Sequence, residues 1–310
     1  MTELRNPPAP ELHRLATPSR LRSLLRLSRP QQWHKSLMLF AAPVAAGVIS
    51  HPLVLLRATV AAAAFILLSI AIYALNDVRD APDDRRHPLK QYRPVAAGEL
   101  SPVAARVWGI AAGLAGLAMA GLLGLPTFLV GLAYLVAQLL YVYGLKHVAV
   151  VDVILVALGF VLRAAAGGTA TRVPVSSWFL VVSLFGSLFL VAGKRQAERK
   201  KTSADPGVDA RSRPVLAAYS TAWLDQLTTV ALLGTIMSYG LWAFQYLGAD
   251  LVRQLLTVSF VPFLTGLLRY GLLVSNGRGE MPEHEIFRDR VLLIAGLAWA
   301  LLVGAGLYLA

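Results

Sequence analysis

Residues 55–84 read LLRATVAAAAFILLSIAIYALNDVRDAPDD. Up to residue 75 this stretch carries one charge, Arg57, and is long enough to cross a bilayer as a helix. Residues 76–84 then hold four aspartates and one arginine. The pattern predicts a membrane-spanning helix that ends in an acidic segment at the membrane surface.

The rest of the 310-residue chain is similar, with 56% hydrophobic and 15% charged residues. This composition excludes a soluble protein and predicts an all-α, polytopic membrane protein with one integral domain at 31–310. A basic, flexible tail is expected at 1–30, and within it 18–29 forms either an amphipathic helix on lipid headgroups or a charge cluster that orients the chain. We expect nine transmembrane spans, at 36–50, 55–75, 104–123, 126–143, 149–170, 176–192, 223–246, 252–274 and 291–310.

The distribution of Lys and Arg predicts the orientation. With a cytoplasmic N-terminus, 25 of the 29 Lys and Arg residues fall on the cytoplasmic side and three on the other, while Arg163 lies inside a span. The acidic segment is therefore expected at the cytoplasmic face. Because the basic residues flank membrane spans, nucleic acid is a poor explanation of the net charge of +12. The absence of cysteine excludes disulfides and thiolate chemistry.

Glycines recur in and just after the third expected span. Small residues let helix backbones approach closely where no hydrophobic effect drives association. They favour packing within one chain, although a homo-oligomer stays compatible with the sequence. These residues are Gly109, Gly113, Gly116, Gly121 and Gly124.

The acidic segment has a spacing suited to a metal site. If the helix continues through it, Asp77, Asp80 and Asp84 share one helical face. Convergent carboxylates need a cation, and oxygen ligands without His or Cys favour Mg²⁺, which commonly arrives with a phosphate. Two alternatives stay open: Pro82 interrupts the helix, or the aspartates form a solvated charge run paired locally with Arg79, Arg85 and Arg86.

A second charged segment, GKRQAERKK at 193–201, carries five basic residues and one acid. On a helix Lys194 and Glu198 share one face while Arg195 and Arg199 share another. The segment could then bind a polyanion from two sides while Glu198 coordinates a metal ion. The alternative is a charge run that only orients the chain.

Arg163 is expected inside the fifth span, where an ionisable side chain normally faces a cavity or a partner. Asp152 lies on nearly the same helical face, ~16 Å away along the axis. We expect both to line a cytoplasm-facing polar cavity, with pairing to a neighbouring helix as the alternative.

The acidic segment resembles the hallmark of UbiA-type intramembrane prenyltransferases, Asn-Asp-x-x-Asp-x-x-x-Asp after the second of nine transmembrane helices. Asn76, Asp77, Asp80 and Asp84 match it in full, and Arg93-Pro94 and Gly98 extend the likeness. Most members carry a second aspartate-rich motif after the sixth helix. This sequence instead has Gly193-Lys194-Arg195-x-x-Glu198, which resembles the decaprenyl-phosphate phosphoribosyltransferase branch. Further likeness to that branch is found in Arg29-Pro30-x-Gln32-Trp33-x-Lys35, Leu145-Lys146-His147, Val151-Asp152-Val153 and Gly159-Phe160-Val161-Leu162-Arg163.

This resemblance implies an enzyme of the plasma membrane that transfers 5-phosphoribosyl from phosphoribosyl diphosphate to polyprenyl (decaprenyl) phosphate, in cell-wall arabinan precursor synthesis. Both substrates are anions, which suits the exchange of acids for Lys and Arg near the sixth helix. We expect Asp77, Asp80 and Asp84, joined by Glu198 and oriented by Asn76, to hold Mg²⁺ on the diphosphate, with inversion at the ribose C1. The expected phosphate contacts are Lys194 and Arg195, with Lys35, Arg93, Lys146 and Arg163 in support.

Two other functions stay open. A prenyltransferase could use a prenyl diphosphate and an aromatic acceptor, but the basic replacement of the second acidic motif argues against it. A carrier or channel for phosphorylated anions would use a positively lined cavity, yet three clustered aspartates fit it badly.

Overall fold

A computed structural model describes residues 19–204, 214–245, 250–279 and 282–308, which form helices and turns without any strand. The long helices are α3 (Pro52–Asp84), α4 (Pro102–Leu123), α5 (Leu125–Tyr143), α6 (Val151–Thr171), α7 (Ser177–Ala204), α9 (Thr221–Phe244), α10 (Asp250–Ser275) and α12 (Arg290–Tyr308). The short elements are α1 (Arg20–Leu27), α2 (Ala41–Ala45), α11 (Pro282–Arg288) and the 3₁₀ helices η1 (Pro30–Phe40), η2 (Lys90–Tyr92), η3 (Leu145–His147) and η4 (Pro214–Ala218).

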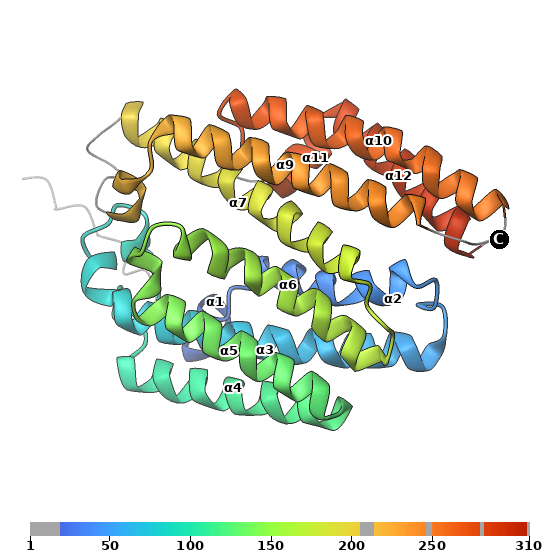
Figure 1. The fold of residues 1–310 in the computed structure, drawn as a ribbon. Coiled ribbons are helices and arrows are strands. Elements are labelled where there is room, and N and C mark those ends of the chain that lie inside the picture. The colour runs from blue at the N-terminus through green and yellow to red at the C-terminus, as the bar shows by residue number, and fades with distance from the viewer. Residues whose placement is uncertain (1–18, 205–213, 246–249, 280–281, 309–310) are drawn as a thin grey trace, which may run out of the picture.

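The long helices form one bundle (Figure 1). Helices α3, α4, α5 and α6 pack together on one side, and α9, α10 and α12 pack together on the other. Helix α7 contacts both α6 and α9 and so joins the two groups. The loop after α3, η3 and η4 lie at the same end of the bundle, opposite the end that carries the C-terminus.

Within the described residues, eight helices are long and apolar enough to cross a membrane. They coincide with eight of the nine expected spans and confirm the polytopic all-α architecture. Nine such helices are not confirmed, because the expected span at 36–50 is built from η1 and α2 instead. Its two buried residues in η1, Ser36 and Leu39, lie three positions apart, which is the repeat of a 3₁₀ helix.

This segment nevertheless extends along the bundle. At its start Arg29 pairs with Asp77 near the end of α3, and at its far end the Val44 carbonyl accepts a hydrogen bond from Tyr308 in α12. A 3₁₀ helix rises ~2.0 Å per residue and an α-helix 1.5 Å, so η1 and α2 together span ~30 Å, about the thickness of a bilayer core.

Close helix contacts depend on glycine at two positions. A Cβ on Gly167 would lie 2.1 Å from the Leu39 carbonyl oxygen, so η1 can rest directly on α6 only if residue 167 is glycine. A Cβ on Gly116 would lie 2.8 Å from the Ala64 carbonyl oxygen of α3. The expected intramolecular packing of small residues is thereby confirmed for α4 against α3.

The described part of the expected tail is a helix. Residues 1–18 lie outside the described residues, but α1 packs against α3 and the following loop, with Leu27 fully buried beside Ala74 and Val95. Arg26 pairs with Glu99 at 2.6 Å. The helix expected within 18–29 is present, and its contact with lipid headgroups stays a prediction.

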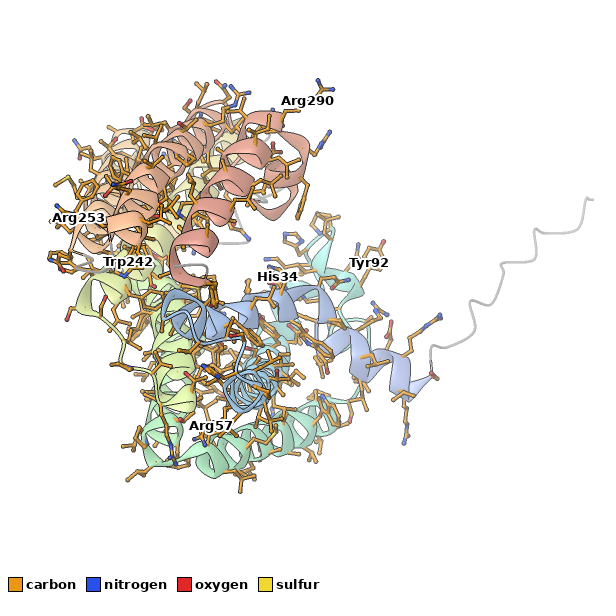
Figure 2. All side chains as sticks on the ribbon, turned by 90° about the vertical axis from the view of Figure 1, so that its right-hand side faces the viewer. His34, Arg57, Tyr92, Trp242, Arg253 and Arg290 are labelled. Atoms are coloured by element: carbon orange, nitrogen blue, oxygen red, sulfur yellow. The ribbon has the colours of Figure 1, made fainter. Side chains whose placement is uncertain are left out.

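The end of the bundle opposite the acidic segment holds few basic residues. Figure 2, which views the molecule from that end, labels Arg57 and Arg253. Arg57 donates hydrogen bonds to the carbonyls of Leu123 and Ala170 at 2.7 and 2.6 Å. These carbonyls lie in the last turns of α4 and α6, where the helix itself supplies no donor for them. This arginine therefore ties three helix ends together.

Candidate active site

The acidic segment is helical throughout, because α3 continues to Asp84 and includes Pro82 in its last turn. Asp77 and Asp84 are buried, with 2% and 4% of their surfaces exposed, whereas the Asp80 side chain is 26% exposed. Carboxylates this enclosed require cations or hydrogen-bond donors as partners. The helix therefore continues through the segment, and the alternative in which Pro82 interrupts it is wrong.

Each of these aspartates pairs with a base that lies outside α3. Arg29, just before η1, pairs with Asp77. Arg93 lies between two carboxylates, 2.7 Å from Asp84 and 3.5 Å from Asp77. Lys146, in η3, lies 2.6 Å from Asp80. We call these six residues, Asp77, Asp80, Asp84, Arg29, Arg93 and Lys146, the acidic-motif cluster.

Local pairing of the aspartates is absent from the described structure. Arg79 donates to the Val142 carbonyl and lies over the Tyr143 ring, 5.2 Å from its centroid. Arg85 donates to the Ala96 carbonyl at 3.3 Å. The aspartates therefore pair with bases outside α3, and the alternative of a solvated charge run paired with Arg79, Arg85 and Arg86 is wrong.

A second group of charges joins α6 to α7. Asp152 is fully buried, and one carboxylate oxygen accepts a hydrogen bond from Arg195 at 3.1 Å. Arg195 is 3% exposed and also pairs with Glu198 at 3.0 Å. The other Asp152 oxygen accepts a hydrogen bond from the Tyr219 hydroxyl. We call these four residues, Asp152, Arg195, Glu198 and Tyr219, the Arg195 cluster.

Tyr219 also supports a strained turn before α6. The Val150 N–H group donates to the Tyr219 hydroxyl oxygen at 2.7 Å. Val150 has a φ of 68°, which is costly for a β-branched residue. Burial and the hydrogen bond to Asp152 both raise the pKa of Tyr219, so this hydroxyl stays protonated and keeps donating to the carboxylate.

The two clusters adjoin at the end of α5. Tyr141 is within electrostatic reach of Arg195 and Asp152 in one cluster and of Lys146 in the other. Tyr141 therefore lies between the two clusters, and a single substrate site that uses both of them stays a prediction.

The remaining expected residues lie in different surroundings. Asn76 is half-buried and, in the described part of the chain, makes no side-chain hydrogen bond. Lys35 is half-buried in η1, and Lys194 is exposed on α7. Arg163 does not share a polar site with Asp152, because it contacts Ser69 and Tyr134 instead.

The sequence prediction missed Arg29. This residue has a φ of 48°, and its guanidinium stacks over Tyr73, 4.8 Å from the ring centroid. Arg29 is the first residue of the segment Arg29-Pro30-x-Gln32-Trp33-x-Lys35, which resembles the phosphoribosyltransferase branch. Of that segment, the sequence prediction includes only Lys35 in the site.

The donor set at the acidic segment suits Mg²⁺ bound together with a phosphate. Among the described residues, no three His, Cys, Asp or Glu side chains are grouped closely enough to hold a metal alone. Mg²⁺ commonly uses one or two carboxylates plus substrate phosphates. Because one guanidinium, that of Arg93, already lies between Asp77 and Asp84, a cation fits between those carboxylates. Glu198 does not meet them here, so its expected metal role stays a prediction.

Residues 36–288 match the UbiA prenyltransferase family. The chain belongs to the UbiA prenyltransferase family. Among its UbiA-type relatives is the decaprenyl-phosphate phosphoribosyltransferase of Mycobacterium tuberculosis, 40% identical over 286 residues that cover 91% of this chain and 93% of the relative. The enzyme of the same name from Corynebacterium glutamicum is 38% identical, over 92% and 87% of the two chains.

A solved structure supports the UbiA fold. The structure of a UbiA homolog from Archaeoglobus fulgidus bound to GPP and Mg²⁺ superposes with a TM-score of 0.68 at 19% identity, covering 92% of this chain and 98% of that one. At this identity the likeness concerns the fold alone. Arg29 precedes the segment that matches the UbiA family, so its role is argued from its contacts.

Proposed function

We propose that this UbiA-family chain transfers 5-phosphoribosyl from phosphoribosyl diphosphate to a polyprenyl (decaprenyl) phosphate and releases diphosphate. The observation that carries the proposal is the 40% identity, over 91% of the chain, to a decaprenyl-phosphate phosphoribosyltransferase. The charge distribution supports it, because 25 of the 29 Lys and Arg residues fall on the side of the membrane where the two phosphorylated substrates would meet.

In the proposed reaction the bond between the ribose C1 and the diphosphate oxygen breaks, and its electron pair leaves with the diphosphate. A new bond forms between C1 and an oxygen of the lipid phosphate. The nucleophile is already an anion, so no side chain has to remove a proton. The chain's own task is therefore to orient two anions and offset their repulsion.

Asp77 and Asp84, with Asp80 beside them, are the residues that would hold Mg²⁺ together with the diphosphate. The bound ion would supply positive charge to the departing diphosphate. The carboxylates are now paired with Arg29, Arg93 and Lys146. We propose that these bases turn to the substrate phosphates when the carboxylates take up the ion, so that the cluster stays neutralised in both states.

Arg195 is held by Asp152 and Glu198, but its Nε–H group is buried without an acceptor in the described structure. The Nε–H group can therefore donate a hydrogen bond to a phosphate while Arg195 stays paired with Asp152 and Glu198. Lys194 is exposed on the same helix and can reach a ligand from the cytoplasmic side. Lys35 and Asn76 complete the proposed site, with Asn76 orienting the acids.

The proposed site lies at the membrane face where most of the Lys and Arg residues fall. By the positive-inside rule this face and the N-terminus are cytoplasmic, in the plasma membrane. A water-soluble donor would then enter from the cytoplasm, and the polyprenyl phosphate from the bilayer. Neither nucleic acid nor a second protein is required.

The test is a transfer assay on membranes that contain the chain. Decaprenyl phosphate and ribose-labelled phosphoribosyl diphosphate should give a labelled lipid with Mg²⁺ and none with excess chelator. A lipid product formed only from a prenyl diphosphate and an aromatic acceptor would contradict the proposal. So would flux of label across sealed vesicles without any new covalent product.

A further inference from the structure

Arg163 is a cation enclosed within the membrane bundle. It is 5% exposed, and its Nη2 donates to the Tyr134 hydroxyl at 2.6 Å and to the Ser69 hydroxyl at 3.1 Å. Nη1 donates to the Gly159 carbonyl at 3.2 Å. In the described part of the chain, no carboxylate lies within ion-pairing distance of this guanidinium.

The contacts of Arg163 leave part of its bonding capacity unused. Its Nε–H group is buried and has no acceptor among the described residues. The rings of Tyr134 and Phe160 lie 4.7 and 5.7 Å away, and their faces offset only part of the positive charge. A buried cation without a counter-ion is costly, and an intramembrane arginine normally serves an anion or a pathway. The missing partner is therefore an anion with an acceptor oxygen.

Arg163 lies deeper than the acidic-motif cluster. Its partner Ser69 precedes Asp77 by eight residues on α3, which corresponds to ~12 Å along the helix. Its partner Tyr134 belongs to an apolar core that includes Leu39, Phe65 and Leu68. Tyr73 is within electrostatic reach of both Arg163 and Arg29. Polar side chains therefore lead from the acidic segment down to Arg163 inside an apolar core.

We propose that Arg163, with Tyr134 and Ser69, receives the phosphate of the polyprenyl phosphate substrate. This assignment rests on the proposed phosphoribosyl transfer. The apolar surroundings favour a phosphate on a hydrocarbon chain over a phosphate of the soluble donor, because a lipid tail already lies among apolar groups. One phosphate oxygen would accept from the free Nε–H, and a second would take the parallel Nη2–H in place of the Ser69 or Tyr134 hydroxyl, which could then donate to the phosphate itself.

Kinetics with each substrate varied separately test the assignment. Arg163→Gln should raise the KM for decaprenyl phosphate at least about tenfold and leave the KM for phosphoribosyl diphosphate within about twofold. Arg163→Lys, which keeps the charge but loses the fork, should give an intermediate value. Tyr134→Phe, which keeps the arginine, should raise the lipid KM by a smaller factor. Arg57→Gln is the matched control, because Arg57 also donates to backbone carbonyls but at the other end of the bundle.

A binding measurement separates this proposal from the proposed reaction. Purified protein without donor should bind radiolabelled decaprenyl phosphate in preference to the uncharged decaprenol, and Arg163→Gln should lose that preference. The preference is expected even if no transfer is detected. If Arg163→Gln does not fold, the same comparison in Arg163→Lys and Tyr134→Phe decides. An unchanged preference in the folded variants, or a rise in the donor KM in place of the lipid KM, would overturn the assignment.

Discussion

In the acidic-motif cluster the side chains of Arg29 and Arg93 keep 25% and 26% of their surface exposed, whereas in the Arg195 cluster Arg195 keeps 3% and Asp152 none. Both clusters pair Asp with Arg at the same end of the bundle. The buried Asp77 and Asp84 are paired with bases that reach water and can turn to a ligand, whereas neither member of the Asp152–Arg195 pair can leave without isolating a buried charge. We infer that the first cluster exchanges its pairs for ligands, and that the second fixes α6 against α7 and so holds Arg195 in place to donate its Nε–H.

The comparison predicts that the same chemical change will have different effects in the two clusters. Asp77→Asn should lower transfer by about 10²–10³-fold, because electrostatic stabilisation of a leaving group is lost. The unfolding temperature should change little, since Arg29 and Arg93 are partly solvated. Asp83→Asn is the matched control, because Asp83 is an exposed carboxylate in the same segment. Near-normal activity of Asp77→Asn, measured by the transfer assay, would remove the proposed ion site.

Asp152→Asn should act on stability first. The change leaves the buried Arg195 without its counter-ion, which costs about 3–5 kcal/mol. Protein yield and the unfolding temperature in detergent measure the effect. The double variant Asp152→Leu, Arg195→Met should recover part of the loss, because it leaves no fully buried charge isolated; Glu198, which loses its pair with Arg195, is 20% exposed. Full stability of the single variant would show that the ion pairs of the Arg195 cluster change partners as readily as those of the acidic-motif cluster.

Arg29→Ala tests whether the bases of the acidic-motif cluster serve the substrate. Loss of one charge-assisted hydrogen bond to phosphate costs about 1.5–3 kcal/mol, or about 10–100-fold in the KM for the donor. Arg86→Ala, which removes an exposed arginine from the same end of the bundle, should leave that KM unchanged. An increase in activity upon Arg29→Ala would instead make Arg29 an inhibitor of ion binding.

Tyr219→Phe should have the smallest effect. It leaves the Val150 N–H group and one Asp152 oxygen without partners, at a cost of about 1–3 kcal/mol in the free energy of unfolding. Adding Val150→Gly should restore part of this, because glycine tolerates the positive φ. Thermal unfolding of both variants measures this, with Tyr92→Phe as the control because the Tyr92 side chain is 65% exposed. A stability equal to the control's would mean that Tyr219 does not hold the turn.

The membrane helices were predictable because a long apolar run determines both the presence and the limits of a span. Helix α4, for example, covers 102–123 where 104–123 is expected. The 3₁₀ segment was not predictable from apolar length, since its form depends on contact between Leu39 and the glycine at 167 on another helix.

The acids of the site were predictable from their spacing on one helix, which is a local property. Their partners were not, because the pairs of Asp77 with Arg29 and of Asp80 with Lys146 join segments 48 and 66 residues apart. The pairing of Asp152 with Arg195 likewise depends on how α6 packs against α7. Sequence spacing instead suggested that Asp152 and Arg163 line one cavity, whereas each has its own partners.

A double-label transfer assay tests the proposed reaction most directly. Phosphoribosyl diphosphate carrying ³H on the ribose and ³²P in the β-phosphate is incubated with decaprenyl phosphate, Mg²⁺ and membranes holding the chain or its Asp77→Asn variant. The ³H should enter the lipid fraction and the ³²P should leave as diphosphate, with both signals lost in the variant. Both labels entering the lipid together, or neither label moving with the unaltered chain, would contradict phosphoribosyl transfer.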